Sequence, residues 1–207
     1  MGNLTPVLMK LNSSLIRRRR VMLSIYMTDH RSGHDVLATL SRLAPGTWVI
    51  FRHYQCSARQ SLAKQAATIC RRRGLVLLVA GDAYLAHCIG ASGLHLPAYL
   101  LNRPSALHRH PKQIMSAAVH SVAELRRAEA LGVDFVLVSP IFQTSSHPGA
   151  RGIGLFGLRD FCRRSSLPVV ALGGINDRNR RAVAATDAVG IAAISLFEGS
   201  HVGKGMM

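Results

Sequence analysis

Short apolar runs recur along most of the chain and alternate with segments whose apolar positions fall three or four residues apart. Short runs rich in Val, Ile and Leu are typical of strands buried on both faces, whereas the wider spacing predicts helices. Strands are predicted at 21–29, 47–54, 75–82, 92–96, 113–120, 135–142, 168–174 and 188–195. Helices are predicted between them at 34–43, 58–73, 83–89, 122–131, 155–164 and 178–185.

Eight strands separated mostly by helices favour an α/β fold of the (β/α)8 TIM barrel type over an open doubly wound sheet. A length of 207 residues with 48% apolar content suits one well-buried domain. The barrel is predicted over residues 21–207. Few residues follow the last predicted strand, so we expect the eighth helix to be short or truncated.

Residues 1–20 differ from the rest of the chain, because they lack a clear period and close with four arginines at 17–20. The basic cluster follows the weakly apolar part instead of preceding it, which disfavours a secretory signal. An organelle presequence and a true start at Met22 both remain compatible with this segment. We interpret it as a basic N-terminal arm.

The formal net charge of +16 attracts polyanions without specifying which, so nucleic acid, anionic lipid and phosphorylated metabolites all fit it. Most basic residues are dispersed, and aromatics make up only 5% of the chain, so specific binding of nucleic acid is not predicted. No apolar run approaches a membrane span, and the four cysteines show no CxxC spacing. We expect a soluble cytoplasmic protein without a membrane partner.

Function in a barrel of this kind is expected at the C-terminal ends of the strands. The polar residues at these ends are Thr28, Asp29, Arg52, His53, Asp82, His95, His120, Ser139 and Ser195. A buried hydrogen bond is the more typical role for His95 in its GLHL run. His120 could instead be a histidine at a helix N-terminus without a catalytic role, since Ser121 and Glu124 form the pattern of a capping box.

The run PVVALGGIN at 168–176 is an apolar strand that ends abruptly at two glycines. Without side chains there, backbone N–H groups can approach an anion closely, and a helix beginning near Asn176 would add its positive dipole. Barrels commonly hold phosphate with the loops after strands seven and eight. The predicted phosphate site is therefore Gly173, Gly174, Ile194 and Ser195, with an ordinary tight turn as the alternative.

Four motifs follow one another in the second half of the chain: VHS at 119–121, SPIFQT at 139–144, LGGI at 172–175 and AVGIAAIS at 188–195. In this order they resemble the thiamine phosphate synthase/TenI family of (β/α)8 barrels. The resemblance continues upstream through IFRHY, VAGDAYLA and GLHLP, and so covers nearly the whole predicted barrel. It implies a thiazole phosphate on the glycine pair and a substrate pocket that includes Ser139, Thr144 and His147.

Two branches of this family differ in their chemistry. The synthases resemble one another in a magnesium-binding pair of aspartates, an active serine on strand five and a lysine after strand six. Arg52 and Asp82 match that pattern here, whereas the remaining positions fall at Leu100, Ala118 and His147. A magnesium-held diphosphate needs carboxylate ligands and cations for its leaving group, so we expect synthase activity to be absent or very slow.

The TenI branch resembles this chain in its VHS after strand five and its LP after strand four. That branch works without a metal and moves a proton to aromatise a thiazole carboxylate phosphate, with the VHS histidine as general acid and base. The resemblance implies His120 as the catalytic acid/base, together with Arg52. An imidazole suits this task because it exchanges protons near neutral pH.

We therefore expect a thiamine-pathway enzyme that binds a phosphorylated thiazole, acts as a thiazole tautomerase and needs no cofactor. The alternative is a thiamine phosphate synthase that joins a pyrimidine diphosphate to thiazole phosphate with Mg²⁺, which Asp82 would then help to hold. An alternative of another class is a nonenzymatic basic barrel that binds polyanions. A homo-oligomer is compatible with each of them.

Overall fold

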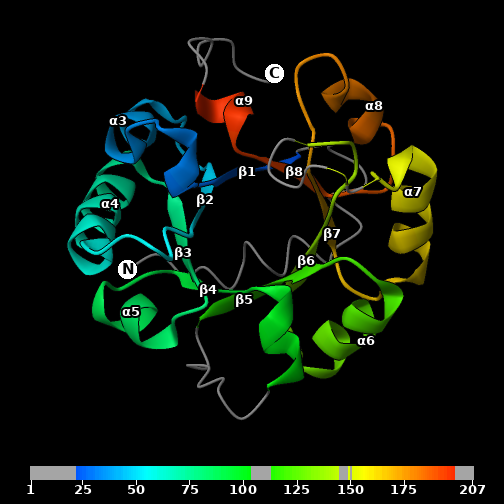
Figure 1. The fold of residues 1–207 in the computed structure, drawn as a ribbon, viewed down its shortest axis with the longest axis horizontal. Coiled ribbons are helices and arrows are strands. Elements are labelled where there is room, and N and C mark those ends of the chain that lie inside the picture. The colour runs from blue at the N-terminus through cyan, green and yellow to red at the C-terminus, as the bar shows by residue number, and fades with distance from the viewer. Residues whose placement is uncertain (1–21, 104–112, 145–148, 150, 199–207) are drawn as a thin grey trace.

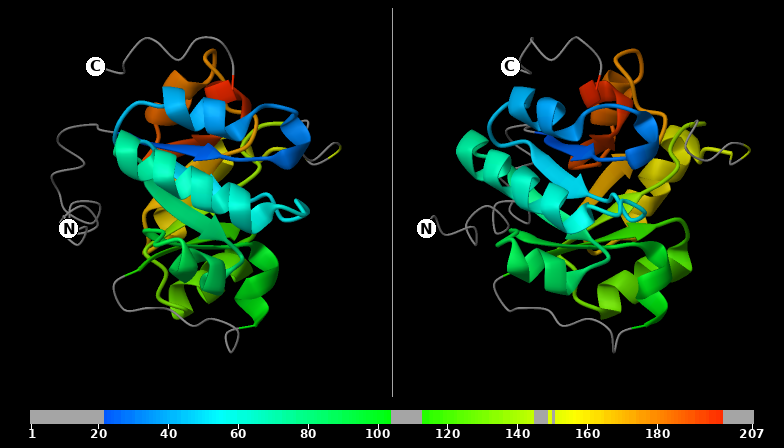
Figure 2. Two further views of the ribbon diagram at one scale, coloured as in Figure 1. Left: turned by 90° about the vertical axis from the view of Figure 1, so that its left-hand side faces the viewer. Right: turned by 60° about the vertical axis from the view of Figure 1, so that its left-hand side comes forward.

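Eight parallel strands close into a barrel in the computed structural model, which describes residues 22–103, 113–144, 149 and 151–198. Helices run around the outside of the barrel (Figures 1 and 2). The strands are β1 (Leu23–Met27), β2 (Trp48–Phe51), β3 (Val76–Ala80), β4 (Gly93–Leu96), β5 (Ile114–Val119), β6 (Phe135–Val138), β7 (Val169–Leu172) and β8 (Gly190–Ala193). The α-helices are α3 (Val36–Arg42), α4 (Arg59–Arg73), α5 (Ala83–Cys88), α6 (Val122–Ala130), α7 (Gly154–Arg164), α8 (Arg180–Ala184) and α9 (Ser195–Glu198).

The order of the strands confirms the predicted (β/α)8 barrel. Each strand pairs with its neighbours in the sequence, and β1 closes the ring by pairing with β8 from Leu23 opposite Gly190 to Tyr26 opposite Ala193. Two short 3-10 helices, η1 (His30–Ser32) and η2 (Ala98–Asn102), stand after β1 and β4. The C-terminal ends of all eight strands therefore surround one mouth of the barrel, and this arrangement positions the site.

The barrel interior is filled by every second residue of the strands, as the pleat requires. An interior cluster includes Ile25, Ile50, Leu137 and Val170, and inside it Trp48 meets Phe135 edge-on at 5.5 Å between ring centroids. Fully burying such a side chain is worth roughly 1.5–3 kcal/mol. The middle of the barrel is thus a packed core.

Small residues let α4 lie close against the outside of the barrel. Its buried positions are Ala63, Ala66, Ala67 and Cys70, which recur every three or four residues. The helix ends at Gly74, whose φ of +66° satisfies a left-handed C-cap that favours glycine. Three arginines in the last turn are stabilised by the negative end of the helix dipole.

The predicted strands overrun the observed ones, because their last residues leave the ladder to form the barrel mouth. The run predicted at 47–54, for example, ends its pairing at Phe51. The helix expected from about Asn176 is wrong in its start: α8 begins only at Arg180, because side chains hold the loop before it. The Asn176 carboxamide accepts from the Arg178 amide at 3.0 Å, and the Asn179 side chain caps the Asn176 amide at 2.9 Å.

The last described helix, α9, has four residues, which agrees with the expected short eighth helix over the part of the chain described. Its Glu198 is buried and accepts hydrogen bonds from Tyr26 at 2.9 Å and Ser32 at 3.0 Å, so α9 is fixed to β1 and η1. The predicted basic arm, residues 1–20, lies outside the described residues. No described helix is long and apolar enough to cross a membrane.

Candidate active site

The pleat of three strands carries predicted site residues to the inner side of the mouth. Ile50, Ile114 and Leu137 point into the barrel, and counting on by twos along their strands reaches Arg52, His120 and Ser139. On β8 the same alternation runs from Ala192 to Ile194, which packs against the interior cluster. The predicted residues from β2, β5, β6 and β8 therefore line one opening.

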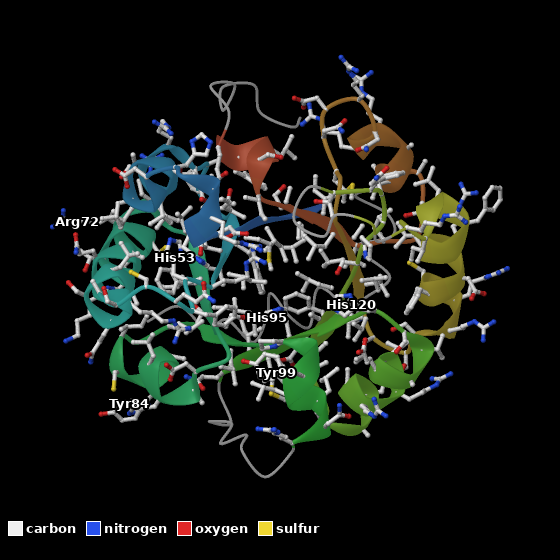
Figure 3. All side chains as sticks on the ribbon, viewed as in Figure 1. His53, Arg72, Tyr84, His95, Tyr99 and His120 are labelled. Atoms are coloured by element: carbon white, nitrogen blue, oxygen red, sulfur yellow. The ribbon has the colours of Figure 1, made fainter. Side chains whose placement is uncertain are left out.

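His120 stands between the end of β5 and the start of α6, with an exposed ring (Figure 3). Its Nδ1 lies 2.8 Å from the Ser139 carbonyl oxygen and 3.2 Å from the Ser139 hydroxyl, both at the end of β6. Its backbone amide donates to the Glu124 carboxylate at 2.5 Å. The ring and the backbone of His120 are thus both held by neighbouring elements.

The capping box predicted at α6 is present, but one of its two hydrogen bonds goes to a neighbouring residue. The Ser121 hydroxyl caps the Glu124 amide at 3.2 Å, as expected. Glu124 returns its bond to the amide of His120 and not to that of Ser121. Because this bond fixes the residue before the cap, the helix start itself contributes to the placement of His120.

Arg52 is held by β1. Its Nε donates to the Thr28 carbonyl oxygen at 2.8 Å, and its Nη2 donates to Asp29 at 3.0 Å. Burial lowers the pKa of Arg52 from its usual value, but a guanidinium in a protein keeps its charge. Hydrogen bonding from Arg31 holds the pKa of Asp29 well below its usual range. Arg52 is therefore a fixed positive charge at the mouth and is unsuited to exchange protons.

His53 and His95 have structural roles, because each ring is buried and its Nδ1 contacts a neighbouring hydroxyl group. The His53 ring is buried, stacks on Phe51 at 5.0 Å between centroids and contacts the Thr28 hydroxyl at 2.9 Å through Nδ1. His95 is 2% exposed inside the barrel, and its Nδ1 lies 2.9 Å from the Ser116 hydroxyl. Burial lowers the pKa of His95 to about 3, so the ring is neutral. The prediction of a buried hydrogen bond for His95 is confirmed.

The glycine pair after β7 adopts backbone conformations that few other residues tolerate, with φ of +100° at Gly173 and +65° at Gly174. The segment after β6 covers it closely: Ile141 donates to the Leu172 carbonyl at 2.9 Å and Phe142 to the Gly173 carbonyl at 3.0 Å. Among the described residues, no loop or cap hydrogen bond takes up the amide of Gly174, whereas Gly173 directly follows Leu172, which still pairs with β8. An amide placed like that of Gly174 suits an anion.

The end of β8 lies beside this turn. Leu172 and Ala192 are the last residues paired between β7 and β8, so the glycine turn and Ile194 follow the ends of two adjacent strands. Ser195 follows with an exposed side chain, and its amide likewise enters no loop or cap bond among the described residues. The four predicted phosphate-site residues therefore follow the C-terminal ends of two paired strands.

Asp82, the residue that matches the magnesium-binding aspartates of the synthase pattern, is held by two donors. Its Oδ1 accepts from the Leu85 amide at 2.8 Å and its Oδ2 from Arg59 Nη1 at 2.8 Å, so both oxygens are engaged. Leu100, in η2, offers no side-chain oxygen. Among the described residues, no cluster of three or more His, Cys, Asp or Glu could hold a metal ion. Mg²⁺ prefers several oxygen ligands, and here a guanidinium already neutralises the carboxylate.

Arg59 is a mouth residue that the sequence reasoning missed. It donates to Asp82 and, at 2.8 Å, to the Ala80 carbonyl oxygen, and it lies 5.6 Å from the Tyr54 ring centroid. One signal could have found it: an arginine on the first residue of a helix faces the positive end of the dipole, which disfavours it unless an anion is near. The predicted pocket residues Ser139 and Thr144 are half-buried, and His147 lies outside the described residues.

Comparisons with known proteins match most of the chain to one family. The sequence profile of TMP-TENI, described as thiamine monophosphate synthase, matches residues 24–197. The putative thiamine-phosphate synthase 2 of Aquifex aeolicus is 34% identical over 177 residues, which are 83% of this chain and 95% of that protein. The thiamine-phosphate synthase of Chloroflexus aurantiacus is 32% identical over 167 residues, or 78% of this chain and 76% of its own.

The solved structures agree with that match. Thiamine phosphate pyrophosphorylase from Pyrococcus furiosus superposes with a TM-score of 0.71 at 26% identity, and the alignment covers 90% of this chain and 92% of that one. FabK from Thermotoga maritima superposes with a TM-score of 0.63 at 13% identity, which shows a shared fold alone.

Proposed function

The chain belongs to the TMP-TENI family of thiamine biosynthesis, and we propose that within this family it binds a thiazole phosphate and moves a proton on it, as a thiazole tautomerase does. In this proposal the phosphate lies on the amides of Gly173, Gly174 and Ser195. The family was predicted from the motifs, and the match over residues 24–197 confirms that membership. The substrate and the reaction are the proposal.

The observation that carries the proposal is the placement of His120. Its ring is exposed at the mouth, held by Ser139 of the next strand, and stands on the inner face together with Ile194. A base fixed in this way can take a proton from a ligand whose phosphate is bound two strands further round the barrel. Positioned general acid–base catalysis contributes typically about 10²- to 10⁴-fold.

Arg52 and Asp29 supply charge to the same mouth without taking part in proton exchange. Arg52 is 20% exposed, so part of its guanidinium faces the opening while Asp29 fixes its orientation. A largely buried positive charge attracts an anionic substrate, and this attraction becomes stronger as water is excluded from the mouth. This role suits a ligand that carries a carboxylate as well as a phosphate.

Thiamine phosphate synthesis is the second candidate, and the names of the relatives favour it over the tautomerase. Both curated relatives above are named thiamine-phosphate synthases, at 34% and 32% identity. The residues of this chain favour the opposite order, because Asp82 is paired with Arg59 and Ala118 and Leu100 carry no polar side chain. No catalytic step is therefore built on a metal at Asp82.

One assay separates the two reactions. The purified protein is given the non-aromatic thiazole phosphate tautomer, and separately the aromatic one, with and without pyrimidine diphosphate and Mg²⁺. The proposal expects conversion to the aromatic tautomer in the presence of a chelator and little or no thiamine phosphate. Robust Mg²⁺-dependent formation of thiamine phosphate, without conversion of the tautomer, would return the chain to the synthase reaction.

A further inference from the structure

The partner of His120 Nδ1 is a backbone carbonyl oxygen, and this choice has a chemical consequence. A carbonyl oxygen only accepts hydrogen bonds, so the Nδ1 at 2.8 Å from Ser139 must carry the proton. A bare Nδ1 would point its lone pair at the carbonyl lone pairs. The Ser139 hydroxyl, at 3.2 Å from the same nitrogen, can accept a share of that proton.

We propose that the Ser139 carbonyl is a positioning group that holds neutral His120 in the Nδ1–H tautomer and leaves Nε2 as the bare nitrogen at the barrel mouth. This inference rests on the proposed function for its catalytic meaning, but the tautomer itself is a property of the free protein. In this role Ser139 acts only through His120 and does not itself exchange a proton with the ligand.

Two buried histidines, His95 and His53, show why the carbonyl matters. The Nδ1 of His95 faces the Ser116 hydroxyl at 2.9 Å, and the Nδ1 of His53 faces the Thr28 hydroxyl at 2.9 Å. A hydroxyl donates or accepts as required, so neither contact selects a tautomer. Among the histidines of the described residues, His120 alone has its Nδ1 against a backbone carbonyl.

The bare Nε2 determines how the proton would travel in the proposed reaction. The ligand C–H bond breaks, its electron pair enters the ring system, and an Nε2–H bond forms to give an imidazolium. The other proton stays on Nδ1 throughout, hydrogen-bonded to the Ser139 carbonyl oxygen. The Nε2–H bond then breaks as the proton is returned to another position of the same ligand, so one base serves both steps and no oxidant or reductant is needed.

The β6 segment also connects this base to the anion site. Ser139 accepts from His120, and two and three residues later Ile141 and Phe142 donate to Leu172 and Gly173 of the glycine turn. The segment therefore touches the base at one end and the cradle at the other. The backbone of residues 139–142 therefore helps to set the distance between His120 and the proposed phosphate site.

Nitrogen NMR of the ligand-free protein tests the tautomer directly. In ¹⁵N-histidine protein, at a pH where the His120 ring is neutral, the ring Cδ2 proton correlates with Nε2 and so identifies that nitrogen. His120→Gln assigns the signal, and His120→Asn does so if the first variant does not fold. We expect a bare Nε2, with the Nδ1–H form in about fivefold excess for one hydrogen bond worth about 1 kcal/mol.

Ser139→Ala is the matched control, because it removes the hydroxyl and keeps the carbonyl. We expect the same tautomer in this variant. A protonated Nε2 in wild type, an even mixture of tautomers, or a switch of tautomer in Ser139→Ala would each overturn the inference. A bare Nε2 in a protein that converts no thiazole tautomer would instead refute the proposed function and leave the assignment of the tautomer standing.

Discussion

Gly174 gives the sharpest test of the anion site, because its backbone and its surroundings both exclude a side chain. A Cβ placed there would lie 2.5 Å from the Gln143 carbonyl oxygen and 2.7 Å from Phe142 Cβ, at a φ of +65°. Gly90 provides a match: its φ is +63°, but a Cβ there would meet nothing within 4 Å. Gly90 precedes β4 and so lies at the end of the barrel opposite the mouth.

The magnitudes follow from these two environments. Placing an L-residue in the left-handed region costs roughly 1–2 kcal/mol, which both Gly174→Ala and Gly90→Ala should lose. Overpacking against fixed backbone typically adds about 1–3 kcal/mol, and only Gly174→Ala should show it. Since small domains have about 5–15 kcal/mol of stability, we expect both variants to fold, with Gly174→Ala the weaker.

Urea unfolding with and without aromatic thiazole phosphate measures both effects in one experiment. A ligand at 100 times its Kd should raise the free energy of unfolding of wild type and of Gly90→Ala by about 2.7 kcal/mol. Gly174→Ala should gain nothing, because Gln143 and Phe142 must move and the glycine amides move with them. Full ligand stabilisation of folded Gly174→Ala would refute the cradle, and equal stability losses in the two variants would refute the clash.

Further predictions concern the base, the metal and the interior histidine. His120→Gln should lower kcat by about 10²- to 10⁴-fold with little change in KM, and wild-type turnover would make His120 structural. A large excess of Mg²⁺ should leave the melting temperature unchanged. Arg59→Met should cost about 1–3 kcal/mol in urea unfolding, because the Ala80 carbonyl and one oxygen of Asp82 lose their donor while the Leu85 amide stays on the other oxygen. The pKa of His95 near 3 lies below its unfolded value, so the unfolded state binds the extra proton as pH falls from 6.5 toward 3, and stability should drop by at most about 1.4 kcal/mol per pH unit. The dependence of the free energy of unfolding on pH over this range should be weaker in His95→Gln. An unchanged pH dependence would contradict a neutral, buried His95.

The barrel and the position of His120 could be predicted because both depend on local pattern. Short apolar runs mark the strands, and a residue at the end of a run must stand at the mouth once the sheet closes. The same reasoning brought Gly174 and Ile194 together, since adjacent strands of a parallel barrel share their C-terminal edge. The spacing of apolar residues and the order of the strands along the chain are therefore enough to predict these positions.

The partners of the charged residues could not be predicted in this way. Arg52 meets Asp29 because β1 and β2 pair with Met27 opposite Ile50, a register that the sequence does not display. Arg59 meets Asp82 only because the start of α4 lies beside the end of β3. Contacts between side chains from different elements depend on angles of packing, which no single run of residues encodes.

A crystal structure of the protein with aromatic thiazole phosphate tests the central claim most directly. The account predicts the phosphate within hydrogen-bond distance of the amides of Gly173, Gly174 and Ser195, and the thiazole ring against Nε2 of His120. A phosphate bound elsewhere, or a ring directed away from His120 toward Arg59 and Asp82, would contradict it.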